Sequence, residues 1–201
     1  MIILISAWLS KVLLPHKKEL SRKIVHIGIG PVILLAWWLN ISLEIAISCA
    51  SVITFFLLVN YRLQLIPIFE DIERKSFGTV LYGVTITLLL ILFWKNNPDA
   101  VCAGVLVMAL GDGLAGLIGK QIKSPYWIIL GQRKSIVGTL TMSLVSAIVL
   151  YITNFLGGSS LEPLQIFAIT SMAVGFEQIS PLGIDNFTVP LTVGIIWQQL
   201  S

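Results

Sequence analysis

The sequence predicts an all-α fold, a polytopic transmembrane bundle of about seven spanning helices that forms a single membrane domain over residues 1–201. Hydrophobic residues make up 56% of the chain and charged residues only 11%, whereas a soluble domain carries about 25% charged residues. The mean hydropathy is +0.93, and the apolar stretches are continuous, without the alternation of barrel strands. This composition excludes an ordinary soluble enzyme, a disordered chain and a secreted disulfide-rich scaffold.

The apolar stretches are the predicted spans. A helix that crosses the bilayer needs about 20 apolar residues, and about 17–25 are tolerated. The first stretch is short and includes Lys11, whose side chain can extend to the membrane surface. A final short stretch, 187–200, is a spanning, a re-entrant or an interfacial helix, and the sequence leaves these alternatives open. The seven predicted spans are residues 2–15, 24–39, 42–60, 79–94, 99–118, 136–155 and 162–177.

Turn-forming residues justify most of the limits between these spans. Asn-Asn-Pro at 96–98, Ser-Pro at 124–125 and Ser-Pro-Leu-Gly at 180–183 each separate two apolar stretches. A fourth break, Gly-Asp-Gly at 111–113, lies inside an apolar stretch. A break within a predicted span marks that span as the first place to look for a functional site.

The basic residues orient the chain in the membrane. The loops 16–23, 61–78 and 119–135 contain eleven lysines and arginines, whereas the opposite loops contain only Lys95. The positive-inside rule therefore places these three loops, and with them 178–186, in the cytoplasm. We expect an integral protein of the cell membrane or an internal membrane. Its net charge of +3 reflects this orientation and predicts no nucleic-acid partner.

Asp112 is the first candidate site residue. It interrupts the apolar run MALGDGLAGLIGK at 108–120, and a carboxylate inside the membrane costs about 2.5–3.5 kcal/mol, so such acids are usually functional. Gly111 and Gly113 either expose backbone N–H groups to an anion or let helices pack closely. An acid beside accessible backbone suits a magnesium–phosphate site. Removing this buried charge by Asp112→Asn is expected to hold or raise stability.

Two basic clusters flank other predicted spans. Arg133, Lys134 and Ser135 precede the span at 136–155, where two cations and a helix N-terminus suit phosphate oxygens. The alternative is a basic anchor at a cytoplasmic helix end. Lys23 immediately precedes the span at 24–39, and His26 lies just inside it. A histidine there is either a site residue or a hydrogen-bonded packing residue.

Acidic residues fall on the same predicted side. Glu70 lies in a charged segment, 69–79, that is either part of the site or a solvated face. Glu177 and Asp185 lie near the Pro-Gly break, where they either assist Asp112 with a metal ion or cap a helix. All the clusters fall on the cytoplasmic side that the basic residues define, as a site for a cytosolic nucleotide requires.

At these residues the sequence resembles the polyprenol kinase family, which includes phytol and dolichol kinases. The resemblance implies an integral membrane enzyme that transfers phosphate from CTP, with Mg2+, to an isoprenoid alcohol. The chain lacks the long extension typical of dolichol kinases, which favours phytol, geranylgeraniol or farnesol. One departure is Val137, where the family often has an acidic residue. The matching segments are SRKIVHIGIGP at 21–31, ALGDGLAGLIGK at 109–120, KSIVGT at 134–139 and DNFTVPL at 185–191.

The resemblance and the residues together give the predicted site. Asp112, His26 and Glu70 are the candidates for the catalytic base. The metal ligands are expected among Asp112, Glu177 and Asp185. The nucleotide is expected to contact Arg22, Lys23, Gly111, Gly113, Arg133, Lys134, Ser135 and Gly138. The glycine face formed by Gly104, Gly113 and Gly116 leaves room for a prenol tail or for a neighbouring helix.

Two other functions stay open at this point. A cytidylyltransferase that makes CDP-diacylglycerol has similar glycine–aspartate and Lys-Ser elements, but it releases pyrophosphate instead of CDP. A small transporter can also carry an intramembrane acid, although its polar groups gather at the midplane. The expected partners are the isoprenoid alcohol, the nucleotide and membrane lipid, and the oligomeric state is left open.

Overall fold

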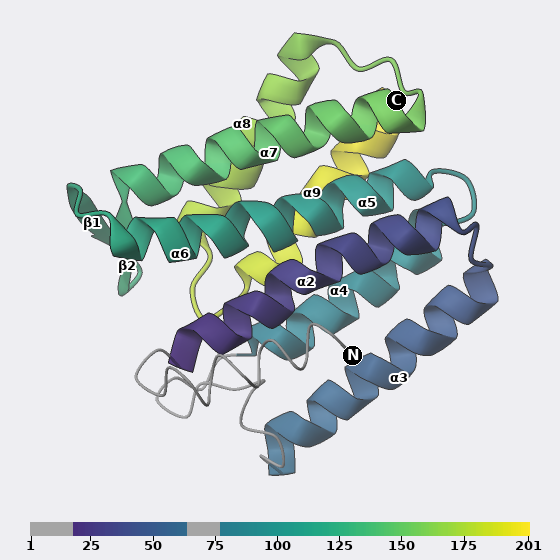
Figure 1. The fold of residues 1–201 in the computed structure, drawn as a ribbon, viewed down its shortest axis with the longest axis horizontal. Coiled ribbons are helices and arrows are strands. Elements are labelled where there is room, and N and C mark those ends of the chain that lie inside the picture. Colours follow the sequence, from purple (N-terminus) through teal and green to yellow (C-terminus); the bar gives the residue numbers. More distant parts are fainter. Residues whose placement is uncertain (1–17, 64–76) are drawn as a thin grey trace.

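The chain forms an apolar helical bundle (Figure 1). The structure is a computed structural model that describes residues 18–63 and 77–201, with side chains from Lys23 onward. The predicted stretch 2–15 therefore lies outside the described residues. The helices are α2 (Lys18–Trp38), α3 (Leu43–Leu63), α4 (Gly78–Phe93), α5 (Pro98–Leu106), the π-helix η1 (Val107–Asp112), α6 (Gly113–Gln121), α7 (Ile136–Gly157), α8 (Pro163–Ile179) and α9 (Asp185–Leu200); the strands are β1 (Tyr126–Ile129) and β2 (Gln132–Ser135).

Each predicted span from 24–39 onward is a helix, which confirms the all-α class. Three helices of the described residues are long and apolar enough to cross a membrane, namely Leu43–Leu63, Pro98–Gln121 and Ile136–Gly157. Two other apolar helices, Lys23–Trp38 and Gly78–Phe93, are shorter. The structure thus supports a membrane protein with three candidate spans among its described residues, and the count of seven stays a prediction.

The break at Gly111-Asp112-Gly113 does not end the helix. The chain passes from α5 through η1 into α6 without leaving a helical course. Asp112 is the last residue of η1. A π-helical turn widens the helix by one residue and often marks a functional site. The glycines and the acid therefore produce a local widening inside a continuous span.

A β-hairpin follows α6, and the all-α prediction did not include it. Tyr126 pairs with Ser135 and Ile129 with Gln132 in an antiparallel register. Aromatic and β-branched residues in β1 favour a strand, and Leu130-Gly131 makes the turn with positive φ at both residues. Residues 132–135, which were predicted in the loop before the span at 136–155, therefore belong to β2, and α7 begins at Ile136.

The core lies along α5. Ala100, Val101, Cys102, Ala103 and Val105 have no exposed surface, because α2, α4, α7 and α9 surround this helix. A Cβ atom on Gly104 would lie 2.5 Å from the Pro190 carbonyl oxygen of α9. The last apolar stretch is therefore a helix packed against the core, which argues against an interfacial helix.

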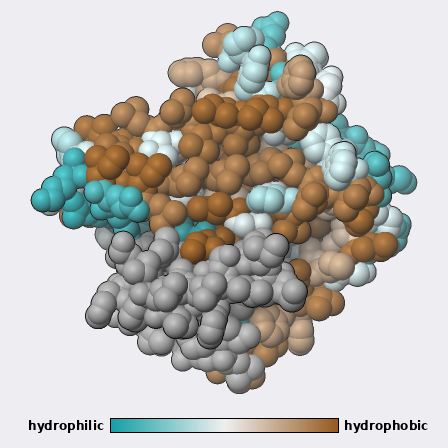
Figure 2. Space-filling model, in the orientation of Figure 1, coloured by the Kyte–Doolittle hydropathy of each residue, from teal (hydrophilic) through white to brown (hydrophobic). Residues whose placement is uncertain are grey.

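The outer surface is apolar, as a lipid-facing bundle requires. Figure 2 shows hydrophobic residues across most of the visible face, with hydrophilic groups gathered toward the ends. On α7, Leu140, Leu144 and Phe155 are 62%, 64% and 80% exposed. α3 makes its main contact with α4, where the Thr54 and Thr87 hydroxyls lie 3.2 Å apart.

Two glycine substitutions test the packing of α6 on α7. A Cβ on Gly119 would lie 3.0 Å from both Gly138 Cα and Ser135 Oγ, whereas a Cβ on Gly175 would meet nothing within 4 Å. We expect Gly119→Ala to lower the free energy of unfolding by about 1–3 kcal/mol through overpacking. Gly175→Ala, the matched control, should raise it by about 0.5–1 kcal/mol. Thermal unfolding midpoints in detergent measure both, and equal shifts would contradict the packing.

Candidate functional site

The first part of the site is an ion pair between α2 and η1. Lys23 Nζ lies 2.6 Å from Asp112 Oδ2 and donates a second hydrogen bond to the Asp112 carbonyl oxygen at 3.2 Å. The two side chains are only 10% and 14% exposed. The helices approach closely because Gly113 faces Ile27 and Gly116 faces the Lys23 side chain.

His26 lies one helical turn after Lys23 and contacts the same carboxylate. Its Nε2 atom is 3.7 Å from Asp112 Oδ2 and 3.1 Å from the Met108 carbonyl oxygen. A carbonyl oxygen only accepts, so this bond assigns the Nε2 proton to His26. The imidazole ring also packs on Tyr82, with ring centroids 4.4 Å apart. His26 is therefore both a packing residue and a neighbour of the acid.

The second part is an ion pair between β2 and α8. Lys134 Nζ bonds to Glu177 Oε1 and to the Glu177 carbonyl oxygen at 2.8 Å. Gln178 donates to Glu177 Oε2 at 2.8 Å and to Thr139 at 3.0 Å. Trp127 of β1 donates to Gln178 at 3.2 Å. This network fastens the hairpin to the end of α8.

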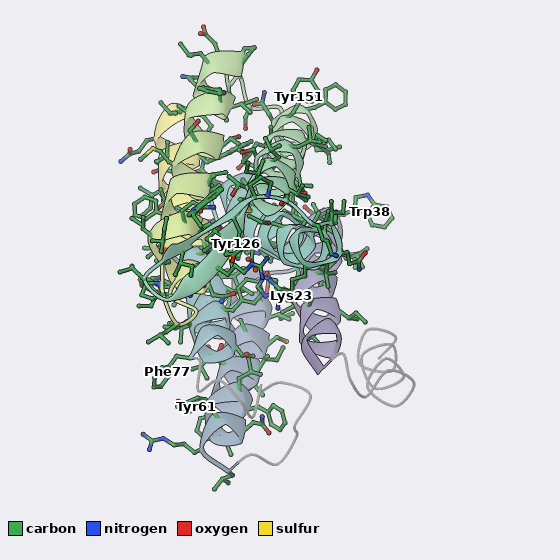
Figure 3. The ribbon with its side chains drawn as sticks, turned by 90° about the vertical axis from the view of Figure 1, so that its left-hand side faces the viewer. Lys23, Trp38, Tyr61, Phe77, Tyr126 and Tyr151 are labelled. Carbon is green, nitrogen blue, oxygen red and sulfur yellow. The ribbon has the colours of Figure 1, made fainter. Side chains whose placement is uncertain are left out.

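The two ion pairs and Asp185 form one electrostatic cluster. Asp185 begins α9, outside the three helices long enough to span. Burial, and after it the charge of Asp112, raise the pKa of Asp185 to about 7, while Lys134 and Lys23 act to lower this pKa. The charges of Asp112, Lys134 and Lys23 therefore reach Asp185. Figure 3 views this end of the bundle, with Lys23 of α2 and Tyr126 of β1 near its middle.

Ser135 and Gly138 shape the start of α7. The Gly138 amide donates to Ser135 Oγ at 3.2 Å, which caps the helix. Gly138 also lies against α6, since a Cβ there would be 3.4 Å from the Ala115 carbonyl oxygen. Both residues place Lys134 at the junction of the hairpin with α7.

The glycines of the Gly-Asp-Gly segment serve helix packing. A Cβ on Gly111 would lie 2.8 Å from both Met142 Sδ and Ser146 Oγ of α7. Gly113 and Gly116 face α2, and Gly104 faces α9. Of the two alternatives that the sequence left open, close packing is the one the structure supports. The expected room for a prenol tail along this face is filled by neighbouring helices.

Some predicted residues do not join the cluster. The Arg133 guanidinium lies over the Tyr126 ring, 3.8 Å from its centroid, on the side of β2 opposite to Lys134, because neighbouring strand residues point to opposite faces. The Arg22 side chain and Glu70 lie outside the described residues. The roles predicted for these three residues stay predictions.

The carboxylates do not form a ready metal cluster. In the described parts of the chain, no group of three His, Cys, Asp or Glu side chains lies close enough together to hold a metal ion. Glu177 is engaged by Lys134. The charge of Asp112 acts on the buried carboxyl group of Asp185. Mg2+ commonly takes only one or two protein carboxylates and completes its shell with phosphate oxygens and water, and these two fit that pattern.

Sequence reasoning missed Gln178, Trp127 and Tyr82. Gln178 adjoins Glu177 and could have been noted as its neighbour. Trp127 required knowledge of the hairpin, and Tyr82 lies in an apolar helix that contains no charged residue. Their contribution depends on tertiary contacts and not on local pattern.

Curated proteins with similar sequences come from cyanobacteria and plants. The phytol kinase of Synechocystis sp. is 39% identical over 181 residues, which cover 89% of this chain and 78% of that protein. A probable phytol kinase 2, chloroplastic, of Oryza sativa subsp. japonica and the farnesol kinase, chloroplastic, of Arabidopsis thaliana are each 28% identical. The matched regions cover 88% and 87% of this chain, but only 64% and 63% of the length of these two relatives.

No family model and no solved structure matches this chain. The identity to the cyanobacterial phytol kinase nevertheless extends over most of both proteins. The chain therefore belongs to the polyprenol kinase family, together with phytol and farnesol kinases.

Proposed function

We propose that this protein transfers the γ-phosphoryl group of CTP, as its Mg2+ complex, to the hydroxyl group of an isoprenoid alcohol such as phytol, geranylgeraniol or farnesol. The observation that carries the proposal is the pair of lysine–carboxylate contacts at one end of an apolar bundle. The relatives named phytol and farnesol kinase support the choice of an isoprenoid alcohol.

The two lysines form the phosphate subsite. Phosphoryl transfer asks a protein chiefly for positioning and charge neutralisation. When no nucleotide is bound, Lys23 and Lys134 are each paired with a carboxylate, Asp112 and Glu177. Their ammonium groups are therefore already ordered in the site, and nucleotide binding costs little further side-chain entropy. Ser135 caps α7 beside them. Binding of the triphosphate replaces part of each carboxylate contact with phosphate oxygens.

Asp112 is the favoured base among the three candidates. The Nε2 atom of His26 already donates to the Met108 carbonyl oxygen, so that nitrogen has no lone pair to accept a proton. In the transfer, the bond between the γ-phosphorus and the β,γ-bridging oxygen breaks and a bond to the alcohol oxygen forms. CDP leaves, and the hydroxyl proton passes to the Asp112 carboxylate.

Asp112 and Asp185 would hold the metal ion that accompanies the nucleotide. When bound, Mg2+ neutralises charge on the phosphate oxygens. The charge of Asp112 opposes the ionisation of the buried Asp185, so a cation there is favourable. Glu177 orients Lys134 instead.

The depth of Asp112 suits an alcohol that stays in the membrane. It lies eight residues before Lys120, about 12 Å along the helix at about 1.5 Å per residue. A prenol loses about 0.8 kcal/mol for each CH2 group drawn from lipid into water. The tail therefore remains between lipid and helices, with the hydroxyl group at the cytoplasmic interface.

The experiment combines purified protein with a panel of nucleotides and prenols. Lipid phosphate is expected with CTP and Mg2+, for alcohols of about 15–20 carbons, and activity should vanish with EDTA. Glycerol and diacylglycerol serve as control acceptors. Phosphorylation of the controls but not of any prenol would contradict the proposal.

A further inference from the structure

The site end of the bundle carries two exposed leucines in an unusual backbone conformation. Leu130 in the hairpin turn and Leu182 in the α8–α9 loop have φ of 48° and 56°, and they are 66% and 65% exposed. Each precedes a glycine with positive φ, Gly131 or Gly183. A left-handed conformation is unfavourable for a residue with a large side chain, and glycine, asparagine or aspartate normally occupies it.

At the opposite end of the bundle, the positive φ is found at a residue type that commonly adopts it. In the described ranges 18–63 and 77–201, the other non-glycine residue with positive φ is Asn40, between α2 and α3. Asparagine tolerates this conformation. Backbone strain at an exposed leucine needs a reason outside the turn itself. That reason has to be an environment that stabilises an apolar side chain projecting from the protein.

The hairpin extends this apolar projection. Tyr126 and Ile128 are 54% and 69% exposed, while the alternate residues Trp127 and Ile129 are half-buried. On α7, which follows the hairpin directly, Ile136 and Leu140 are 41% and 62% exposed. Figure 1 shows the hairpin at the end of the bundle, next to the ends of α6 and α7. Exposed apolar residues therefore occur both on the outer face of the hairpin and at the start of the helix that follows it.

Arg133 lies at the edge of this face, as basic residues commonly do where an apolar surface meets lipid headgroups. Arg133 pairs with Ile128 across the hairpin, and its guanidinium lies over the Tyr126 ring. Arginine and tyrosine at the edge of an apolar surface bury their apolar parts and keep their polar ends among lipid headgroups. In bulk water the same arrangement would be unfavourable, because the apolar side chains of Ile128 and Leu130 would be exposed to solvent without any stabilising contact.

We infer that the outer face of the hairpin (Tyr126, Ile128 and Leu130), together with Leu182, inserts into the headgroup–acyl boundary of the leaflet at the site end. The occupant of this surface is membrane lipid. Trp127 ties β1 to Gln178 at the end of α8, so the two leucine turns belong to one docked unit. Lys134 lies on the inner side of that unit. Docking therefore fixes the depth of Lys134 relative to the membrane surface.

Site-directed fluorescence tests this insertion without using enzymatic activity. Cys49 and Cys102 are replaced by alanine, and an environment-sensitive fluorophore is attached to Leu130→Cys or Leu182→Cys in phosphatidylcholine vesicles. Leu144→Cys on α7 is the lipid-facing control, and Asn96→Cys in the exposed α4–α5 turn is the aqueous control. Quenchers are nitroxide lipids and iodide, the latter loaded on both sides of the vesicle.

We expect nitroxide quenching at Leu130 and Leu182 to reach at least half of that at Leu144, with iodide quenching at least threefold weaker than at Asn96. Iodide quenching equal to that at Asn96 would overturn the inference. Protection from both quenchers would also overturn it, because a second copy or another protein would then cover the face.

A second variant separates insertion from folding. Leu130→Asn relieves the strained turn, so it should raise the thermal unfolding midpoint in detergent. It should also reduce nitroxide quenching of a fluorophore on Ile128→Cys at least twofold in vesicles. A lowered midpoint with unchanged quenching would show that Leu130 serves the fold, and would contradict its role as a lipid contact.

Discussion

Replacing Asp112 by asparagine should reduce prenol phosphorylation about a hundredfold or more. The substitution preserves side-chain volume but removes the carboxylate that lies 2.6 Å from Lys23 Nζ and 3.7 Å from His26 Nε2. Loss of a single group that stabilises charge in a transition state commonly costs about 10²–10³ in rate. Initial rates at saturating CTP and alcohol measure the effect, and added Mg2+ should not restore it.

The same substitution should also destabilise the protein. The sequence alone predicted that Asp112→Asn would hold or raise stability, because it removes a buried charge. The structure contradicts that expectation, since Lys23 is only 8% exposed and would lose its partner. Breaking a buried ion pair by removing one member costs about 3–5 kcal/mol.

A double variant separates catalysis from folding. Lys23→Met combined with Asp112→Asn removes both charges, so the unfolding midpoint should recover most of the loss while turnover stays at or below the level of Asp112→Asn. Turnover near wild type in the double variant would show that the ion pair is structural.

Lys134→Met should lower kcat/KM for CTP about 10- to 100-fold. A charge-assisted hydrogen bond contributes about 1.5–3 kcal/mol, and about 1.4 kcal/mol corresponds to a factor of ten. Lys123→Met, at an exposed lysine of the same end, is the matched control and should change kcat/KM less than about twofold.

Glu177→Gln distinguishes a nucleotide-binding role of Lys134 from a purely structural one. The glutamine keeps an oxygen for Lys134, and the Glu177 backbone carbonyl at 2.8 Å is unaffected. The loss in kcat/KM should therefore be clearly smaller than for Lys134→Met. Equal losses, with an unchanged KM for CTP, would show that this pair only fastens the hairpin to α8.

The helices and their order along the chain were predictable because bilayer thickness and continuous apolar runs limit the choices. The predicted stretch 99–118 corresponds to the observed continuous helix Pro98–Gln121. The union of Lys23 with Asp112 was only partly predictable. Both were placed at one end of the bundle, but their contact depends on Gly113 and Gly116 admitting α2, and a glycine series alone equally suits an anion site.

The hairpin explains most of what the sequence could not predict. A basic segment before an apolar span is equally consistent with a helix start. The sequence therefore did not indicate that Arg133 and Lys134 lie in a strand and point to opposite faces of it. The π-helix was hidden as well, because Gly-Asp-Gly has the composition of a break, whereas surrounding helices keep the chain helical through Asp112. Tertiary packing decided both outcomes.

The most direct test of the central claim follows the isotope from two labelled forms of CTP into the lipid product. With a prenol acceptor, label from the γ-phosphate should appear in the lipid in step with CDP release, and label from the α-phosphate should stay in the nucleotide. Lys23→Met/Asp112→Asn should abolish the transfer. Appearance of α-label in the lipid with release of pyrophosphate would contradict a kinase and identify cytidylyl transfer at this site.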